Sequence, residues 1–211
     1  MIELYGYWRS GTSYRTRIAL NLKGLDYRQH PLDLRKGEHK SPDFIRLQPQ
    51  GLVPALAVEG QVLFQSPAII EWLEERYPDP PLLPTDAGDR AQVRAMAAIV
   101  GCDIHPLNNL RVLKALRRDF AADQAAIDAW AARWIAEGFA ALEPLVARHG
   151  AGFAWGDRPG LVDVYLVPQA YSAERFGVTL DSWPAISRAV ASARAHPAFA
   201  AADPARQPDA D

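Results

Sequence analysis

The sequence predicts an α/β domain followed by an all-α domain. Short strand-like runs alternate with helical patterns near the start of the chain, and two further runs are joined by Glu59-Gly60 as a hairpin. Residues 78–84, Pro-Asp-Pro-Pro-Leu-Leu-Pro, are incompatible with regular structure, and only Ala-rich helical periodicity follows them. We therefore expect a first domain at residues 1–80 and a helical domain at residues 86–203.

The first domain contains four expected strands and two well-marked helices. The strand-like runs cover residues 2–7, 27–32, 55–58 and 61–64. In the first helix, apolar side chains repeat at four-residue intervals before a glycine stop: Tyr14, Ile18, Leu22 and Gly24. A later helix begins with Ser66 as its N-cap and proline at the first helical position, and places three apolar side chains on one face: Ile69, Leu73 and Tyr77.

Helical periodicity continues through the second domain. One long helix, with a bend at Pro106, is predicted by the spacing of Val93, Ala97, Val100, Ile104 and Leu107. Another helix is marked by Trp130, Trp134 and Leu142. From Pro204 onward the sequence has little to bury, so we expect residues 204–211 to form a mobile tail.

Composition limits the classes of function. The 211 residues are 49% apolar with a formal net charge of −2, which excludes a disordered chain and gives no reason to expect nucleic acid or a membrane as partner. No uncharged run approaches the roughly 18 residues of a membrane helix, and Met-Ile-Glu-Leu-Tyr does not resemble a signal peptide. We therefore expect a cytoplasmic protein. Cys102, the single cysteine, excludes an internal disulfide and a cysteine-based zinc site.

Hydroxyls gather where the first strand gives way to the first helix. Ser10, Thr12 and Ser13 lie around the expected helix N-terminus. The unpaired N–H groups there and the positive end of the helix dipole favour an anion, and a hydroxyl can donate one more hydrogen bond. The alternative is simple helix capping, for which serine and threonine are preferred residues.

Four sequence blocks resemble the zeta class of glutathione transferases, which includes the maleylacetoacetate and maleylpyruvate isomerases. They are Trp8-Arg-Ser-Gly-Thr-Ser with Arg15-Thr-Arg-Ile-Ala-Leu, then Leu52-Val-Pro-Ala-Leu, Gln65-Ser-Pro-Ala-Ile-Ile, and Cys102-Asp-Ile-His-Pro-Leu-Asn-Asn-Leu-Arg-Val-Leu. The resemblance covers nearly the whole chain. It implies a thioredoxin-like N-terminal domain, a C-terminal helical glutathione-transferase domain and a homodimer, with glutathione as cofactor and no metal.

The resemblance also implies which residues bind glutathione. Ser10, Arg9 and Thr12 are the expected catalytic residues, with Ser10 as the donor to the thiolate. Thr12 stands where many members have cysteine, which removes any role for a protein sulfur. Val53 precedes Pro54 in a cis peptide and pairs with the cysteinyl backbone. The remaining expected contacts are Gln65 and Ser66 at the γ-glutamyl carboxylate, His39 and Gln50 at the glycyl end, and the polar pair His105 and Asn109. Capping or solvation without a ligand is the alternative for these residues.

A small dicarboxylate is the expected second substrate. Guanidinium groups suit the charge that spreads onto its oxygens after thiolate addition. The resemblance places Arg9, Arg111 and Arg175 at the substrate, with Asn108 one turn before Arg111 on the same helix face. Each of these arginines alone is also compatible with a solvated surface position, because the chain has many arginines.

The predicted reaction is cis–trans isomerisation of maleylacetoacetate by thiolate addition, rotation and elimination. Three alternatives stay open: maleylpyruvate as substrate, conjugation of glutathione to electrophiles, and a non-catalytic binding protein of the same fold.

Two positions depart from the pattern of the family. Gly160 replaces the usual serine or threonine of a capping box with Asp163, which we expect to cost a few tenths of a kcal/mol. Gln48 replaces the more usual asparagine.

Overall fold

The computed structural model describes residues 1–211, which form two compact units. The first comprises Met1–Pro81 together with His196–Asp211, and the second comprises Leu82–Ala195. The division near residue 81 lies close to the predicted boundary. The assignment of residues 196–203 to the helical domain differs from the structure, because this segment returns to the first unit.

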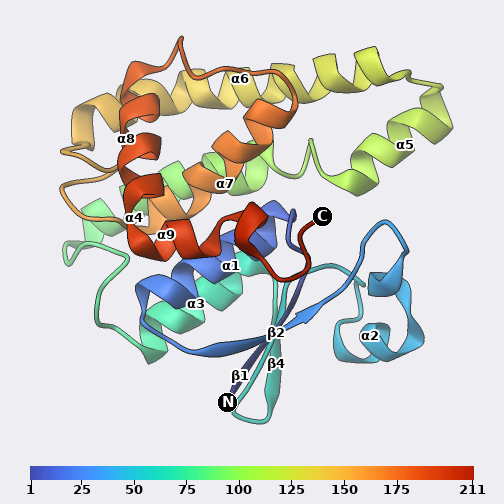
Figure 1. Cartoon of the computed structure of the whole chain (residues 1–211). Helices are drawn as coiled ribbons and strands as arrows, with labels where there is room; N and C mark the ends of the chain where they lie inside the picture. Colours follow the sequence, from blue (N-terminus) through green and yellow to red (C-terminus); the bar gives the residue numbers. More distant parts are fainter. The chain divides into compact units, whose positions relative to one another are not determined.

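A four-stranded sheet forms the centre of the first unit (Figure 1). Its strands are β1 (Ile2–Gly6), β2 (Tyr27–Pro31), β3 (Ala55–Val58) and β4 (Gln61–Phe64). They lie in the order β2-β1-β3-β4, with β1 parallel to β2 and the other neighbours antiparallel. All four predicted strands are confirmed, since strand ends vary by a residue between descriptions.

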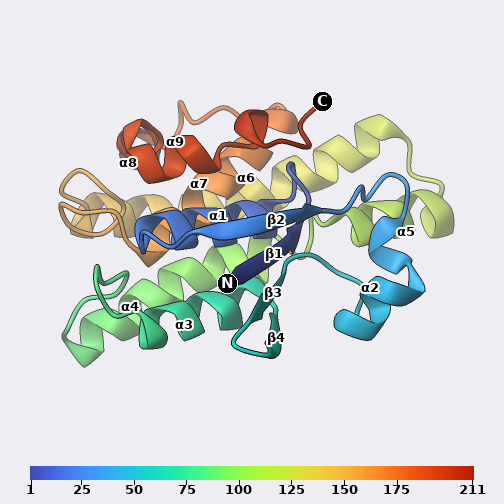
Figure 2. The ribbon, with the colours of Figure 1, turned by 60° about the horizontal axis from the view of Figure 1, so that its bottom comes forward.

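Helix α1 (Gly11–Leu22) connects the two parallel strands and packs against α3 (Ser66–Arg76). The predicted apolar repeat is confirmed at its centre, because Tyr14 and Ile18 are buried. The helix ends where Gly24 takes a φ of 64° and the Leu25 N–H bonds to the Leu20 carbonyl. Two short elements, η1 (Glu38–Lys40) and α2 (Pro42–Leu47), follow β2, and both views place α2 well apart from α1 and α3 (Figures 1 and 2).

The predicted N-cap of α3 is wrong by one residue. Gln65 is the N-cap, with φ 68° and ψ 111°, and Ser66 is the first helical residue. The unusual Gln65 backbone turns the chain into the helix before Ser66, so the Ser66 hydroxyl is not used as a cap.

The predicted mobile tail is instead built into the first unit. Helix α9 (Pro197–Ala202) packs along α1, and the Asn21 side chain donates to the Ala198 carbonyl at 2.9 Å. A short 3₁₀ turn, η3 (Pro204–Arg206), follows, and Gln207 beyond it is buried. Phe199 and Ala202 of α9 are buried, whereas beyond Pro204 the buried side chain is the polar Gln207, which is why hydrophobic patterning gave no sign that residues 204–211 are anchored.

The second unit is helical, as predicted. Its helices are α4 (Ala87–Ala98), the π-helical turn η2 (Ile99–Ile104), α5 (Leu110–Phe120), α6 (Gln124–His149), α7 (Leu161–Arg175) and α8 (Pro184–Ala195). Helix α7 is buried along most of its length and packs against α4 and α8. No helix of the chain combines the length and apolar content needed to cross a bilayer.

The predicted long helix through Pro106 is interrupted rather than bent. After η2 the chain forms turns rather than a helix at residues 105–109, and Asn109 caps a new helix by accepting from the Arg111 N–H at 3.0 Å. Proline lacks an N–H group and its ring crowds the preceding turn, so helix propagation stops there. The indole of Trp130 stabilises this break by donating to the Leu107 carbonyl at 2.8 Å.

Candidate functional site

A chain of hydroxyl hydrogen bonds lies at the N-terminus of α1. Ser10 is the N-cap, and its Oγ accepts from the Ser13 N–H at 3.3 Å. Ser10 Oγ also lies 2.9 Å from Thr12 Oγ1, which donates to the Val53 carbonyl at 2.9 Å. Thr12 has one hydroxyl proton and gives it to Val53, so Ser10 must supply the proton of the Ser10–Thr12 bond. The capping interpretation and the anion-site interpretation of Ser10 are therefore compatible, because capping uses only a lone pair.

The Val53–Pro54 peptide is cis, as the family resemblance implies. Thr12 links the Val53 carbonyl to the Ser10 hydroxyl by two successive hydrogen bonds, although Val53 is far from both residues in sequence. Ser10, Thr12 and Val53 are half-buried, whereas Pro54 is buried. The structure thus brings four of the predicted residues into one cluster.

The N-terminus of α3 forms a second polar cluster in the same unit. Ser66 is 1% exposed, and its Oγ has no hydrogen-bond partner. No acidic side chain lies in the first turn, so nothing in the helix neutralises the positive end of its dipole. A buried hydroxyl without a partner is costly, and an anion at this helix end would supply one.

Two glutamines tie a neighbouring loop to this helix end. The Gln65 amide donates to Gln50 Oε1 at 2.6 Å, and the Gln50 N–H donates to Gln48 Oε1 at 2.5 Å. Gln48 is buried, so this amide shapes the loop that carries Gln50. The same loop approaches His39, because a Cβ placed on Gly51 would lie 2.8 Å from the His39 carbonyl oxygen.

Sequence analysis missed the role of Gln48. Its place before Pro49 was a departure from the family pattern without a mechanism, and the structure supplies one, since its side chain accepts a backbone N–H two residues on. The available signal was that asparagine, the more usual residue at this position, commonly bonds through its side chain to a nearby backbone N–H and so forms a local turn.

Arg9 lies directly before Ser10, and its guanidinium stacks on the ring of Trp8. Its guanidinium carbon is 5.3 Å from the centroid of the Trp8 ring, and the side chain is half-buried. The Trp8 backbone is held in turn by Arg17, whose Nη2 donates to the Trp8 carbonyl at 2.9 Å. Burial lowers the pKa of Arg17 to about 10, so it remains charged at neutral pH.

The remaining predicted residues belong to the second unit. His105, Asn108 and Asn109 lie in the break before α5, Arg111 lies in its first turn, and Arg175 ends α7. The expected shared helix face of Asn108 and Arg111 is wrong, because Asn108 precedes the helix. Asn108 is buried, and its amide nitrogen has no partner. Arg111 and Arg175 are exposed, and the Arg175 guanidinium carbon lies 5.8 Å from the Phe176 ring centroid.

Asp163 organises the start of α7. Its carboxylate oxygens accept from the Ala154 N–H at 2.9 Å and the Gly160 N–H at 3.0 Å. The aspartate half of the capping box is therefore present, and the side-chain half is missing at Gly160, as predicted. Burial raises the pKa of Asp163 to about 7 despite these hydrogen bonds.

Comparison with known proteins gives extensive similarity over the whole chain. Residues 9–76 match the family model for the glutathione S-transferase N-terminal domain. The chain is 56% identical to a maleylacetoacetate isomerase of Pseudomonas aeruginosa, over 99% of this chain and 98% of that protein. It is also 56% identical to a maleylpyruvate isomerase of Ralstonia, over 99% of both proteins. The chain belongs to the zeta class of glutathione transferases.

Solved structures agree with this zeta-class assignment. A holo maleylpyruvate isomerase, described as a bacterial zeta-class transferase, has a TM-score of 0.97 and 55% identity, covering 99% of this chain and 100% of that one. A maleylacetoacetate isomerase from Anaeromyxobacter dehalogenans, solved with glutathione in its active site, has a TM-score of 0.90 and 42% identity, covering 100% and 98%. The predicted thioredoxin-like and helical glutathione-transferase architecture is confirmed.

Proposed function

We propose that this zeta-class transferase is a glutathione-dependent isomerase that converts maleylacetoacetate to fumarylacetoacetate. The observation that carries the proposal is the hydroxyl chain from Ser10 through Thr12 to the Val53 carbonyl, next to a helix N-terminus. Such a site suits a thiolate, because it offers a hydroxyl proton and a positive dipole end together. The names of the relatives at 56% identity support the same reaction.

The residues of the first unit fit glutathione along its length. The unpartnered Ser66 hydroxyl and the N-terminus of α3 would hold the γ-glutamyl carboxylate, with the Gln65 amide beside it. The Val53 backbone would pair with the cysteinyl residue. Gln50 and His39 would bind the glycyl end. In the second unit, we assign His105 and Asn109 to the same ligand on the family pattern.

Glutathione, when bound, supplies the thiolate that adds to the cis double bond and leaves after rotation about the resulting single bond. Ser10 donates its proton to that sulfur, which requires the hydroxyl to turn away from Thr12. A thiol of cysteine type has a pKa of about 8.5, and each unit of depression requires about 1.4 kcal/mol in favour of the thiolate. One hydrogen bond to a charged acceptor, worth about 1.5–3 kcal/mol, is sufficient.

The arginines bind the dicarboxylate and the charge that develops on its oxygens. The position of Arg9 beside Ser10 and its stacking on Trp8 support this role. Arg111 and Arg175 provide exposed guanidinium groups for the carboxylate ends. The buried Asn108 amide nitrogen, which has no partner in the protein, provides a further donor. Positioning and electrostatic stabilisation are then the main contributions of the protein.

Maleylpyruvate is the second candidate substrate. The Ralstonia relative of that name has the same identity to this chain as the maleylacetoacetate isomerase, and the holo maleylpyruvate isomerase structure has a TM-score of 0.97. The two substrates differ mainly in the keto-acid tail, which only the carboxylate-binding arginines would sense. A comparison of kcat/KM for the two substrates, with glutathione saturating, decides between them.

We further propose that the enzyme is a cytoplasmic homodimer. Large apolar side chains are exposed on β4 and at the end of α5, where Phe64 is 42% and Phe120 is 77% exposed. Burial of such residues in an interface is favourable by about 25 cal/mol per Å² of apolar surface. Light scattering coupled to size-exclusion chromatography would give twice the monomer mass for the wild type.

Turnover with and without glutathione tests the main proposal. The wild type should isomerise maleylacetoacetate only when glutathione is present, and the total glutathione concentration should not change. Net consumption of glutathione with formation of a stable adduct would support the conjugating alternative. Absence of both binding and turnover would support the non-catalytic alternative.

A further inference from the structure

Trp8, two residues before Ser10, is bonded to the C-terminal segment directly at its N–H and through Arg17 of α1 at its carbonyl. Asp209 Oδ2 accepts from the Trp8 N–H at 3.0 Å. On the other side, Arg17 Nη2 donates to the Trp8 carbonyl at 2.9 Å, and Arg17 Nε donates to the Ala202 carbonyl at 3.1 Å. One backbone group of Trp8 is therefore bonded by Asp209 itself, and the other by an arginine that also contacts the C-terminal segment.

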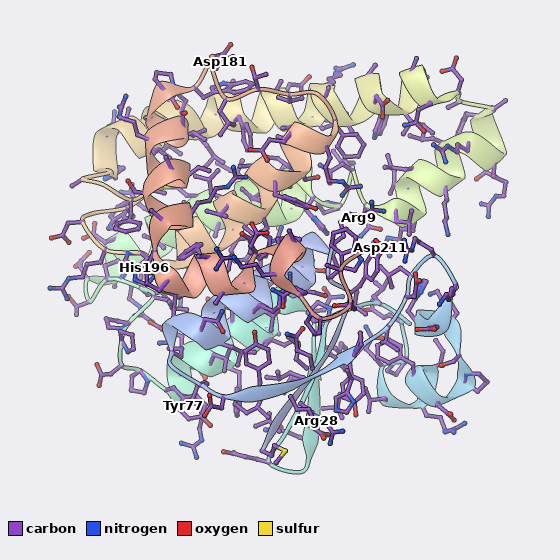
Figure 3. The ribbon with its side chains drawn as sticks, viewed as in Figure 1. Arg9, Arg28, Tyr77, Asp181, His196 and Asp211 are labelled. Carbon is purple, nitrogen blue, oxygen red and sulfur yellow. The ribbon has the colours of Figure 1, made fainter.

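The C-terminal segment is itself anchored on either side of Asp209. Gln207 is buried, donates to the Ala201 carbonyl at 3.0 Å and accepts from Gln29 of β2 at 3.0 Å. Beyond Asp209, the Asp211 carboxylate pairs with Arg35. Figure 3 labels Arg9 and Asp211, which belong to the two segments that this arrangement joins. Asp209 is thus presented to Trp8 from a fixed segment.

The hydrogen bonds to Trp8 act on a closed turn. The Ser10 N–H donates to the Tyr7 carbonyl at 3.0 Å, so Trp8 and Arg9 are the central residues of a turn from Tyr7 to Ser10. Fixing the Trp8 N–H and carbonyl fixes the peptide planes before and after it. These planes set the direction in which Arg9 leaves the turn and the position at which Ser10 begins α1.

We propose that Asp209 is a positioning residue for the thiolate site. Its carboxylate holds the Tyr7–Ser10 turn in the geometry in which Ser10 and Arg9 face the bound sulfur and substrate. The C-terminal segment, which follows Ser10 by about 200 residues, then helps to position the residues of the site. This inference rests on the proposed role of Ser10.

Asp209→Ala tests the inference, with Asp211→Ala as the matched control. Loss of the Asp209 carboxylate should lower kcat/KM about tenfold, the effect of about 1.4 kcal/mol, and raise the pKa of the bound glutathione thiol by about half a unit. Asp209→Asn keeps an oxygen acceptor and should retain most of the activity. Asp211→Ala removes only the exposed ion pair with Arg35, of a kind that contributes little to stability, and leaves the bond from the Trp8 N–H to Asp209 in place, so it should keep nearly wild-type kcat/KM.

The outcomes separate this inference from the proposed function. If Asp209→Ala matches Asp211→Ala in kcat/KM and thiol pKa, the inference is wrong. A lowered melting temperature with an unchanged thiol pKa would also overturn it, because the role would be structural only. Ser10→Ala is measured alongside: if it raises the thiol pKa while Asp209→Ala does not, only the Asp209 role fails. If Ser10→Ala leaves the thiol pKa unchanged, the proposed site itself fails.

Discussion

Replacing Thr12 with valine removes the middle hydroxyl of the Ser10 cluster and keeps the shape of the side chain. In the structure Thr12 accepts the Ser10 proton and donates its own to Val53, with both oxygen–oxygen distances at 2.9 Å. Ser10 must therefore break one hydrogen bond before it donates to a thiolate, at a net cost of about 1 kcal/mol. Without Thr12 this cost disappears, so the pKa of the bound glutathione thiol should fall by about 0.7 unit.

The thiolate absorbs in the ultraviolet, so a pH titration of the enzyme–glutathione complex measures this pKa. Thr12→Ser is the control, because it keeps both hydrogen bonds and should titrate as wild type. Thr12→Val should also lower the free energy of unfolding by about 1 kcal/mol, because the Val53 carbonyl loses its partner. A thiol pKa that rises by about one unit in Thr12→Val would refute the reasoning. It would mean that Thr12, rather than Ser10, supplies the donor to sulfur.

Three further predictions concern the carboxylate sites and α7. Ser66→Ala should raise the Kd for glutathione about tenfold by calorimetry without lowering the melting temperature, because the Ser66 hydroxyl has no partner in the protein; an unchanged Kd would contradict this assignment. The double variant Arg9→Ala, Arg175→Ala should lose about 100-fold in isomerisation kcat/KM while binding glutathione normally; full isomerisation by this variant would exclude both arginines from the reaction. The folded protein holds the Asp163 proton up to pH about 7, whereas the unfolded chain releases it near the ordinary value of 3.8. Raising the pH through this window should therefore lower the free energy of unfolding, by about 3 kcal/mol between pH 5 and 8. Asp163→Asn should lack this slope in urea unfolding, and equal slopes in the two proteins would show that Asp163 is ionised in the fold.

Local sequence patterns were sufficient to predict the strands, α1 and the proximity of the Ser10 and Thr12 hydroxyls. The four strands and the first helix follow from apolar spacing and turn residues within short windows. Because Ser10 and Thr12 flank the same helix start, their proximity follows from local geometry alone. Their link to the Val53 carbonyl was not predicted, since no local rule joins residues separated by 41 positions.

Two of the features that sequence analysis missed, the roles of Asp209 and Gln207, depend on polar contacts between distant residues. Asp209 is 201 positions from Trp8, and a single aspartate in a polar segment carries no pattern that marks its partner. The same holds for Gln207, whose burial depends on three hydrogen bonds rather than on apolar surface. The break before α5 was expected only as a bend, because apolar spacing continues through Pro106 and does not report where backbone hydrogen bonding stops.

The pH dependence of isomerisation by wild type and Ser10→Ala tests most directly whether Ser10 stabilises the thiolate. In the wild type, kcat/KM for glutathione-dependent turnover of maleylacetoacetate should rise to its plateau with an apparent pKa at least one unit below the ordinary thiol value of about 8.5. In Ser10→Ala the apparent pKa should return to about 8.5, with activity lost at neutral pH and largely recovered at alkaline pH. Superimposable profiles for the two proteins would contradict the assignment of Ser10 as the donor to sulfur.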